Sequence, residues 1–237
     1  MNILIPMAGG GTRFQRAGFT DSKPLIDVLG LPMIVRVIDN IGNLGKFVFI
    51  LRKDAHDCDR LTALLKAIKP DCVIVYTDHL TRGAAETCLL AKEHIIDDSL
   101  LIANCDQIQD WSPSIFKKFV DSNDNDGVIV TFRSTDKNNS YAEITGTRRV
   151  IRVAEKQVIS IHATTGVYFW RSGREFVRDA ESMISKNITT NNEFYVCPVY
   201  NETIANGGKI DAFWIDKHWP IGTPEDLEIY VKNHENL

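Results

Sequence analysis

A glycine-rich turn followed by two basic residues is the feature of this sequence best suited to chemistry. Gly9, Gly10 and Gly11 follow a short apolar run. Three glycines allow positive φ angles, so the backbone N–H groups can surround phosphate oxygens. An ordinary tight turn would explain the glycines alone equally well. Arg13, which can donate two parallel hydrogen bonds to a phosphate, and Lys23, a second cation, favour phosphate binding.

Two common phosphate-binding motifs do not fit this sequence. The P-loop pattern GxxxxGK[ST] does not occur, and Phe14 stands where the third glycine of the dinucleotide pattern G-x-G-x-x-G belongs. A P-loop protein and a hydride-transfer enzyme are therefore both disfavoured.

The glycine turn and the residues after it carry a family resemblance. Residues 9–14, with Lys23, Pro24 and Leu25 downstream, resemble the signature of the nucleoside-diphosphate-sugar pyrophosphorylases and their cytidylyltransferase relatives. In that family the glycine loop and the arginine hold a triphosphate, and the lysine contacts the reacting phosphates. The resemblance implies that Arg13 and Lys23 are catalytic. It also implies a set of nucleotide-binding residues, namely Ala8, Gly9, Gly10, Gly11 and Thr12.

Two later segments extend the resemblance on the nucleotide side. Residues 81–87 are similar to the family segment that lines the base and ribose, which implies binding roles for Thr81, Gly83 and Ala84. Asp106 follows a short apolar strand and matches the family's metal-binding aspartate. A carboxylate suits Mg²⁺, which prefers carboxylate and phosphate oxygens. Asp106 is therefore the expected Mg²⁺ ligand and the third catalytic residue.

The second half of the chain resembles the acceptor-binding side of the family. The implied acceptor-binding residues are Glu155, Lys156, Gly166 and Glu193. The glutamate–lysine pair would meet the sugar and phosphate of the acceptor, and the glycine would let the acceptor approach the backbone. These segments also resemble a capsule and surface-polysaccharide branch that includes cytidylyltransferases for non-sugar phosphates, so the acceptor stays open.

Three positions depart from the family pattern. Cys105 replaces a glycine, Gln157 replaces a proline, and Pro220 stands where many members have an aspartate that serves as a second metal ligand. Asp216 lies four residues before Pro220, and the sequence does not decide whether it reaches the metal. The second metal ligand is left unassigned.

The elements that must position these residues alternate between strand and helix in the first half. Short apolar runs predict strands, and apolar residues at helical spacing predict helices. Strands are expected over residues 2–7, 46–51, 72–76, 100–103 and 127–132, with helices from residue 32 and over residues 61–68, 84–94 and 115–120. This rhythm predicts a mainly parallel sheet with helices on both faces, with ligands beyond the carboxyl ends of the strands.

After residue 132 the pattern changes to short strands separated by turns. Strands are expected over residues 140–145, 150–155, 164–170 and 210–215, and helices near residues 176–184 and from residue 224. The first three of these strands predict an antiparallel extension. With the resemblance, we expect a single nucleotidyltransferase domain over 1–237, with a nucleotide-binding half at 1–133 and an acceptor-binding half at 134–237. Its fold class is α/β, a Rossmann-like, three-layer (GT-A-like) fold with a mainly parallel mixed sheet.

Composition is that of a globular cytoplasmic protein. Of the 237 residues, 44% are hydrophobic and 24% charged, and the net charge of -4 argues against nucleic acid as the main partner. No segment has the ~20 apolar residues of a membrane span or the basic start of a secretory signal. The five scattered cysteines and six histidines show no metal-binding spacing, so reduced thiols are expected. Apolar helices are compatible with a homo-oligomer.

The sequence thus predicts a nucleotidyltransferase that releases pyrophosphate. It would join the nucleoside monophosphate part of an NTP (CTP, UTP or dTTP) to a phosphorylated small molecule, first of all a sugar 1-phosphate, for capsule or surface-polysaccharide precursors. The first alternative is a CTP-dependent cytidylyltransferase for an amino-acid-like or choline-like phosphate. The second is a non-catalytic nucleotide sensor. A GT-A glycosyltransferase is less favoured, because it leaves the triphosphate loop unexplained.

Overall fold

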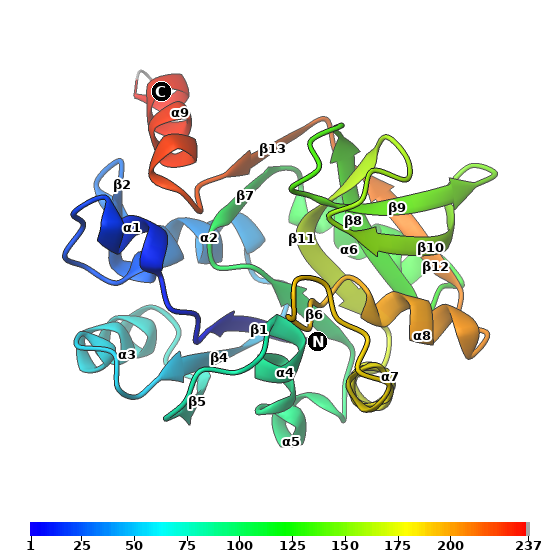
Figure 1. Cartoon of the computed structure of the whole chain (residues 1–237), viewed down its shortest axis with the longest axis horizontal. Coiled ribbons are helices and arrows are strands. Elements are labelled where there is room, and N and C mark those ends of the chain that lie inside the picture. Colours follow the sequence, from blue (N-terminus) through cyan, green and yellow to red (C-terminus); the bar gives the residue numbers. More distant parts are fainter. Residues whose placement is uncertain (236–237) are drawn as a thin grey trace.

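A nine-stranded mixed sheet forms the centre of the computed structural model, which describes residues 1–235 (Figure 1). The strand order is β5-β4-β1-β6-β11-β8-β12-β10-β9. Four strands at one end run parallel, as the alternating pattern predicts: β1 (Asn2–Met7), β4 (Lys46–Arg52), β5 (Val73–Thr77) and β6 (Leu100–Ala103). Parallel strands are buried on both faces, which explains their continuous apolar sequences.

The other end of the sheet is mostly antiparallel and closes on itself. It comprises β8 (Gly127–Arg133), β9 (Ser140–Thr145), β10 (Arg149–Glu155), β11 (His162–Trp170) and β12 (Ile210–Trp214). β9 and β10 extend the sheet as predicted. β11 does not extend it but lies between β6 and β8, antiparallel to both. Because Ala163 of β11 also pairs with Tyr141 of β9, the five strands form a closed ring.

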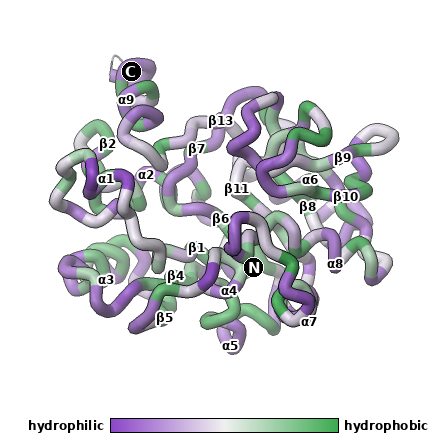
Figure 2. The backbone as a smooth tube through the Cα atoms, in the orientation of Figure 1, coloured by the Kyte–Doolittle hydropathy of each residue, from purple (hydrophilic) through white to green (hydrophobic). Residues whose placement is uncertain are grey.

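Alternate residues of the strands feed two hydrophobic cores, one on each face of the sheet. In β1, Leu4 packs on one face while Ile3 and Ile5 pack on the other, and β4 and β6 alternate in the same way. The Leu4 face is covered by α4 (Ala84–Leu89), α5 (Lys92–Ile95), α7 (Gly173–Ser185) and α8 (Val199–Ala205). The Ile3 face is covered by α2 (Met33–Ile41), α3 (Cys58–Ile68) and α6 (Pro113–Ser122). The expected three layers are thus present, and hydrophobic and hydrophilic residues alternate along α3 and α7 (Figure 2).

The helix expected over residues 84–94 is divided, and several short elements were not predicted. The division falls at residues 90–91, where Ala91 is fully buried and is the N-cap residue of α5. The additional elements are α1 (Thr12–Arg16), the 3₁₀ turn η1 (Lys23–Leu25), β2 (Asp27–Val28), β3 (Leu31–Pro32), β7 (Gln107–Asp110), α8 and β13 (Lys217–Pro220). Most are too short or too polar to give a periodic signal.

The C-terminal helix α9 (Pro224–His234) lies over a third, smaller core. Its start is as predicted, because the Thr223 hydroxyl accepts a hydrogen bond from the Asp226 N–H at 3.1 Å. Leu227 and Tyr230 pack against N-terminal residues, including Phe14 of α1. β13 leads into this helix and pairs antiparallel with β7. Helix α9 thereby lies beside the N-terminal elements α1 and β2 (Figure 1).

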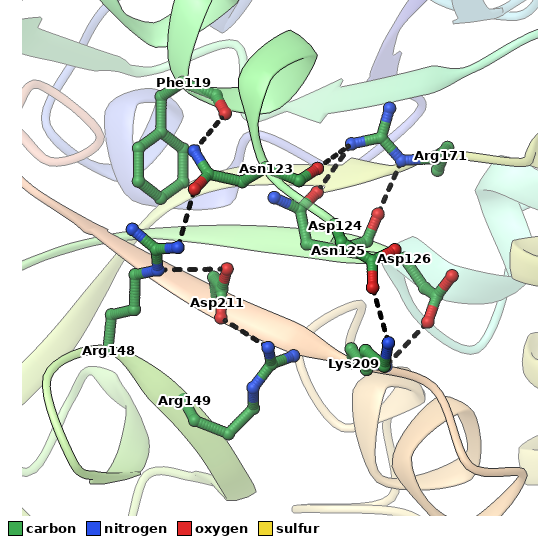
Figure 3. Close-up of polar contacts among 10 residues, drawn as sticks. All are labelled: Phe119, Asn123, Asp124, Asn125, Asp126, Arg148, Arg149, Arg171, Lys209 and Asp211. Carbon is green, nitrogen blue, oxygen red and sulfur yellow. Dashed lines mark hydrogen bonds and ion pairs between the residues drawn. The ribbon is translucent and has the colours of Figure 1, made fainter.

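A charged network closes the end of the sheet where β8 and β12 begin (Figure 3). Asp211, whose side chain is 1% exposed, lies 3.3 Å from Arg148 and 3.4 Å from Arg149. Arg171 donates to the carbonyl oxygen of Asn125 at 2.5 Å, at the turn that follows α6. The network joins the β9–β10 hairpin to β12 and so helps to close the ring.

All five cysteines are free thiols, four of them buried. Within residues 1–235, no helix has the length and apolar character needed to cross a membrane.

Candidate functional site

A cavity of about 780 Å³ opens at the carboxyl ends of β1, β4 and β6. Arg13, Lys23 and Asp106 all line this cavity, although they are distant in sequence. This is the edge of the sheet where ligands of open α/β folds bind. The other predicted site residues that line the cavity are Ala8, Gly9, Gly10, Gly11, Thr12, Thr81, Gly83, Ala84 and Glu193.

The glycine turn presents open backbone to this cavity. A side chain built on Gly9 would meet nothing within 4 Å, so a ligand has free access to the backbone there. Gly11 is the residue before α1 and has a φ of 60°, a left-handed conformation that favours glycine. The turn therefore has the shape and access that a phosphate-binding loop requires.

Lys23 and Asp106 form an ion pair inside the cavity. The Lys23 Nζ donates a hydrogen bond to Asp106 Oδ2, and the two side chains are 22% and 17% exposed. Burial alone would lower the pKa of Lys23, but the opposing negative charge of Asp106, with its hydrogen bond, leaves that pKa above its ordinary value. Lys23 thus stays positively charged near neutral pH, beside a carboxylate.

The segment that precedes α9 fixes Asp106 from the other side. The Ile221 N–H donates to the Asp106 carbonyl oxygen at 2.8 Å. A Cβ built on Gly222 would overlap Asp106 Oδ2 and lie 3.4 Å from the Lys23 Nζ. Only a glycine leaves room for the ion pair at this point.

The structure places the positions that depart from the family pattern. Cys105 is at the cavity wall, and burial raises the pKa of its thiol to about 11, so it stays protonated. Pro220 pairs with Gln107, next to Asp106, but brings no ligand oxygen in its side chain. Asp216 precedes the opposite end of β13, where Lys217 pairs with Asp110, and Lys217 is itself roughly 10 Å from Pro220 along the extended strand. Asp216 is therefore too remote to share a metal ion with Asp106.

The base-side segment and the acceptor-side glutamate are tied together. Gly83 has a φ of 141°, and a side chain on it would overlap the Phe194 backbone. The Ala85 N–H donates to the Phe194 carbonyl oxygen at 2.9 Å. Arg82 also lies over the Phe194 ring at 4.7 Å. These contacts hold Glu193 at the cavity, so a residue expected on the acceptor side shares the space of those expected on the nucleotide side.

Glu155 and Lys156 lie at the end of β10, beyond the residues that line the cavity. The Lys156 Nζ donates to the Tyr195 hydroxyl at 2.6 Å, and Glu155 accepts a hydrogen bond from Ser140. Burial raises the pKa of Glu155, and the negative charge of Glu193 contributes in the same direction. The predicted acceptor residues thus form a neighbouring cluster that reaches the cavity through Glu193.

Gly166 was expected to face the acceptor, but it faces the side chains of Asn104 and Gln107. Its φ is 81°, at an irregularity in β11, and a Cβ there would lie 2.7 Å from Gln107 Oε1 and 2.9 Å from Asn104 Cγ. Asn104 and Gln107 flank Asp106 in sequence. The glycine therefore lets β11 pack closely against the loop that carries Asp106.

Sequence reasoning missed the cavity wall that follows β4. Arg52, Asp54, His56 and Asp57 line the cavity, as does Ser22 beside Lys23. The signal was present, because these polar residues follow the carboxyl end of a buried parallel strand. No motif marks them.

Comparison with known proteins agrees with this architecture. Residues 3–229 match the model of the nucleotidyl transferase family. No curated protein matches the chain. A nucleoside-diphosphate-sugar pyrophosphorylase from Vibrio cholerae RC9 is 24% identical, with a TM-score of 0.85 over 97% of this chain and 99% of that one. A UDP-glucose pyrophosphorylase solved with UDP-glucose is 15% identical, with a TM-score of 0.79 over 99% and 98% of the two chains. An inositol-1-phosphate CTP transferase from T. maritima is 13% identical, with a TM-score of 0.77 over 97% and 93%. The predicted fold class is confirmed.

Proposed function

The chain belongs to the nucleotidyl transferase family, and from this premise we propose that it transfers a nucleoside monophosphate from an NTP to a sugar 1-phosphate. A phosphate oxygen of the acceptor attacks the α-phosphorus and forms the new P–O bond. The bond from the α-phosphorus to the bridging oxygen breaks, and pyrophosphate leaves. The observation that carries this proposal is the convergence of Arg13, Lys23 and Asp106 on one glycine-lined cavity.

The residues of the cavity would act by position and charge. The acceptor phosphate is already anionic near neutral pH, so the reaction needs no general base. Two anions must meet, and fixed positive charges lower that repulsion. The glycine turn and Arg13 would hold the β- and γ-phosphates, and Lys23 would stabilise the charge that develops around the α-phosphorus.

The carboxylate of Asp106 fits a divalent cation that is bound mainly by the nucleotide. Within residues 1–235, no group of three or more His, Cys, Asp or Glu side chains is placed to hold a metal ion. Mg²⁺ commonly takes one or two carboxylates and completes its coordination with phosphate oxygens and water. We propose Asp106 as that carboxylate. The ion would supply charge neutralisation and polarisation of the α-phosphate.

The acceptor proposal rests on the cluster beside the cavity. Glu155 and Glu193 offer carboxylate oxygens that accept hydrogen bonds from sugar hydroxyls, and Lys156 offers a cation for the phosphate. We propose one nucleotidyltransferase domain, in which residues 1–133 bind the nucleotide and residues 134–237 chiefly bind the acceptor. A pyrimidine NTP, and a role in capsule or surface-polysaccharide precursors, are the finer parts of this proposal.

Pyrophosphate release tests the proposal directly. Purified protein with Mg²⁺ is screened with CTP, UTP and dTTP against sugar 1-phosphates and against amino-acid-like and choline-like phosphates. We expect turnover with a sugar 1-phosphate, and a loss of about 10²–10³ in kcat for Lys23→Ala and for Asp106→Ala. If turnover occurs only with CTP and a non-sugar phosphate, the proposed sugar 1-phosphate acceptor is wrong and the non-sugar acceptor takes its place. Near-wild-type turnover in both variants, or nucleotide binding without turnover, would refute the mechanism.

A further inference from the structure

The loop that delivers Lys23 to the cavity has little structure of its own. Residues 17–22 connect α1 to η1 and lie outside helices and strands, and most of their side chains are exposed. An exposed irregular loop makes few contacts that fix its path. The path by which the chain enters η1 is therefore set by contacts with another part of the chain, together with the burial of Pro24 and Leu25 in η1.

The buried side chain of Asp57 contacts the residue next to Lys23. Asp57 is the residue before α3, a position where a carboxylate commonly accepts hydrogen bonds from its own helix. Here it makes no such bond. Its side chain is 7% exposed, and Oδ2 accepts a hydrogen bond from the Ser22 N–H at 2.8 Å. A buried carboxylate is costly unless it accepts hydrogen bonds, so breaking its bond to the Ser22 N–H would be unfavourable. The bond therefore constrains the loop.

Two further contacts join the same loop to the residues around Asp57. His56 Nε2 lies 3.0 Å from the Thr20 carbonyl oxygen, and Arg60 Nη1 donates to Asp21 Oδ1 at 2.6 Å. Both side chains are about 60% exposed, His56 at 62% and Arg60 at 59%. Exposed contacts of this kind contribute little to stability. Three consecutive loop residues, 20–22, are thus bound by the start of α3, and Asp57 supplies the buried contact.

Asp57 and Ser22 also belong to the cavity wall. Both line the same cavity as Lys23, and within the described chain Asp57 Oδ1 and Ser22 Oγ are buried without a hydrogen-bond partner. The contact is therefore made at the site rather than on the outer surface.

We propose that Asp57 is a positioning residue for Lys23. By holding the Ser22 N–H, it fixes the backbone that enters η1 and keeps the Lys23 ammonium group in reach of Asp106 and of the reacting phosphates. This inference rests on the proposed function, which gives Lys23 its role. A positioned cation acts on the transition state, so loss of Asp57 should appear in kcat more than in KM.

A double-mutant cycle tests the inference. The variants are Asp57→Ala, Asp57→Asn, Lys23→Ala and the double variant Asp57→Ala/Lys23→Ala, assayed for pyrophosphate release with the same NTP and acceptor. We expect Asp57→Ala to lower kcat by about 10-fold to 100-fold. Asp57→Asn keeps an oxygen that accepts the Ser22 N–H and should stay within about threefold of wild type. The double variant should be no slower than Lys23→Ala, because the two residues act as a unit. Asp59→Ala, an exposed carboxylate in the first turn of the same helix, is the matched control and should be neutral.

The outcomes separate this inference from the proposed function. Near-wild-type turnover of Lys23→Ala would refute the proposed function, and the inference with it. A large loss in Lys23→Ala with no loss in Asp57→Ala would overturn the inference alone. So would an equal further loss when Asp57→Ala is added to Lys23→Ala, because Asp57 would then act by another route. Thermal unfolding of each variant shows whether it folds, and recovery in Asp57→Asn distinguishes positioning from a general loss of stability.

Discussion

Gly222→Ala would test the geometry of the ion pair with one methyl group. The added Cβ would overlap Asp106 Oδ2, lie 3.1 Å from Asp106 Cγ and 3.4 Å from the Lys23 Nζ. Gly222 does not have a left-handed φ, so the backbone itself tolerates alanine. The cost arises from the carboxylate, which must move. Overpacking of this kind costs about 1–3 kcal/mol. For a chain of this size that corresponds to a fall in Tm of roughly 2–12 °C.

The effect on catalysis should exceed the effect on stability. A carboxylate displaced by about an ångström no longer sits where Lys23 and a metal ion need it, and misplacement on that scale can cost about 10²-fold in rate. The measurements are kcat from pyrophosphate release and Tm from thermal unfolding, for wild type and Gly222→Ala. Asp106→Ala serves as the background control, because removal of the carboxylate makes room for the methyl group.

Two results would contradict this reasoning. Wild-type kcat and Tm in Gly222→Ala would show that the closing segment does not press on Asp106. An equal fall in Tm when Gly222→Ala is added to Asp106→Ala would place the clash elsewhere. We expect the Tm cost to disappear in that background.

Three further predictions concern stability. Because burial raises the pKa of Glu155, the folded protein keeps this proton to a higher pH than the unfolded chain, so stability falls as pH rises above about 4.3. The Tm of Glu155→Gln should therefore rise relative to that of wild type as pH increases from about 4.3, and a constant difference would contradict this. Burial lowers the pKa of His218 to about 4, against the opposing charge of Asp106, so stability should be lost as pH falls from about 6.5 to about 4; His218→Gln should lose less Tm over that range, and an unchanged profile would refute the assignment. Asp211→Asn removes the buried charge between two arginines and should cost about 1–3 kcal/mol in chemical denaturation. The kcat should be unchanged, because Asp211 is the second residue of β12, whose amino end is opposite the cavity, and a fall in kcat would show coupling across the sheet.

The parallel half of the fold could be predicted from the sequence because β1, β4 and β6 are largely buried on both faces. The strand expected over residues 100–103 coincides with β6, and that over residues 46–51 falls one residue short of β4. Such strands are continuous apolar runs with sharp ends. The position of β11 between β6 and β8 could not be predicted, because its apolar sequence indicates a buried strand but not which strands lie beside it. β7, with two glutamines and an aspartate in four residues, carries no apolar pattern at all.

In the site, too, residues in short sequence motifs could be predicted, whereas contacts between residues distant in sequence could not. The glycine turn, Lys23 and Asp106 could be recognised because each stands in a short motif directly after a strand or loop. Their meeting in one cavity follows from the parallel order of β1 and β6. Asp57 was missed because its partner is a backbone N–H 35 residues away, and a backbone group leaves no trace in the sequence. The roles assigned to the site residues remain predictions for the assays above.

The position of β11 has a consequence for synthesis of the chain. When residues 1–133 have left the ribosome, β6 has one of its two neighbours, and β8 has neither, because both β11 and β12 come later. An unpaired strand edge is prone to unwanted association. The edges of β6 and β8 therefore stay unpaired until residues 162–170 emerge and insert between them, and the cavity, whose lining includes Glu193 and Gly222, is complete only after most of the chain has been made.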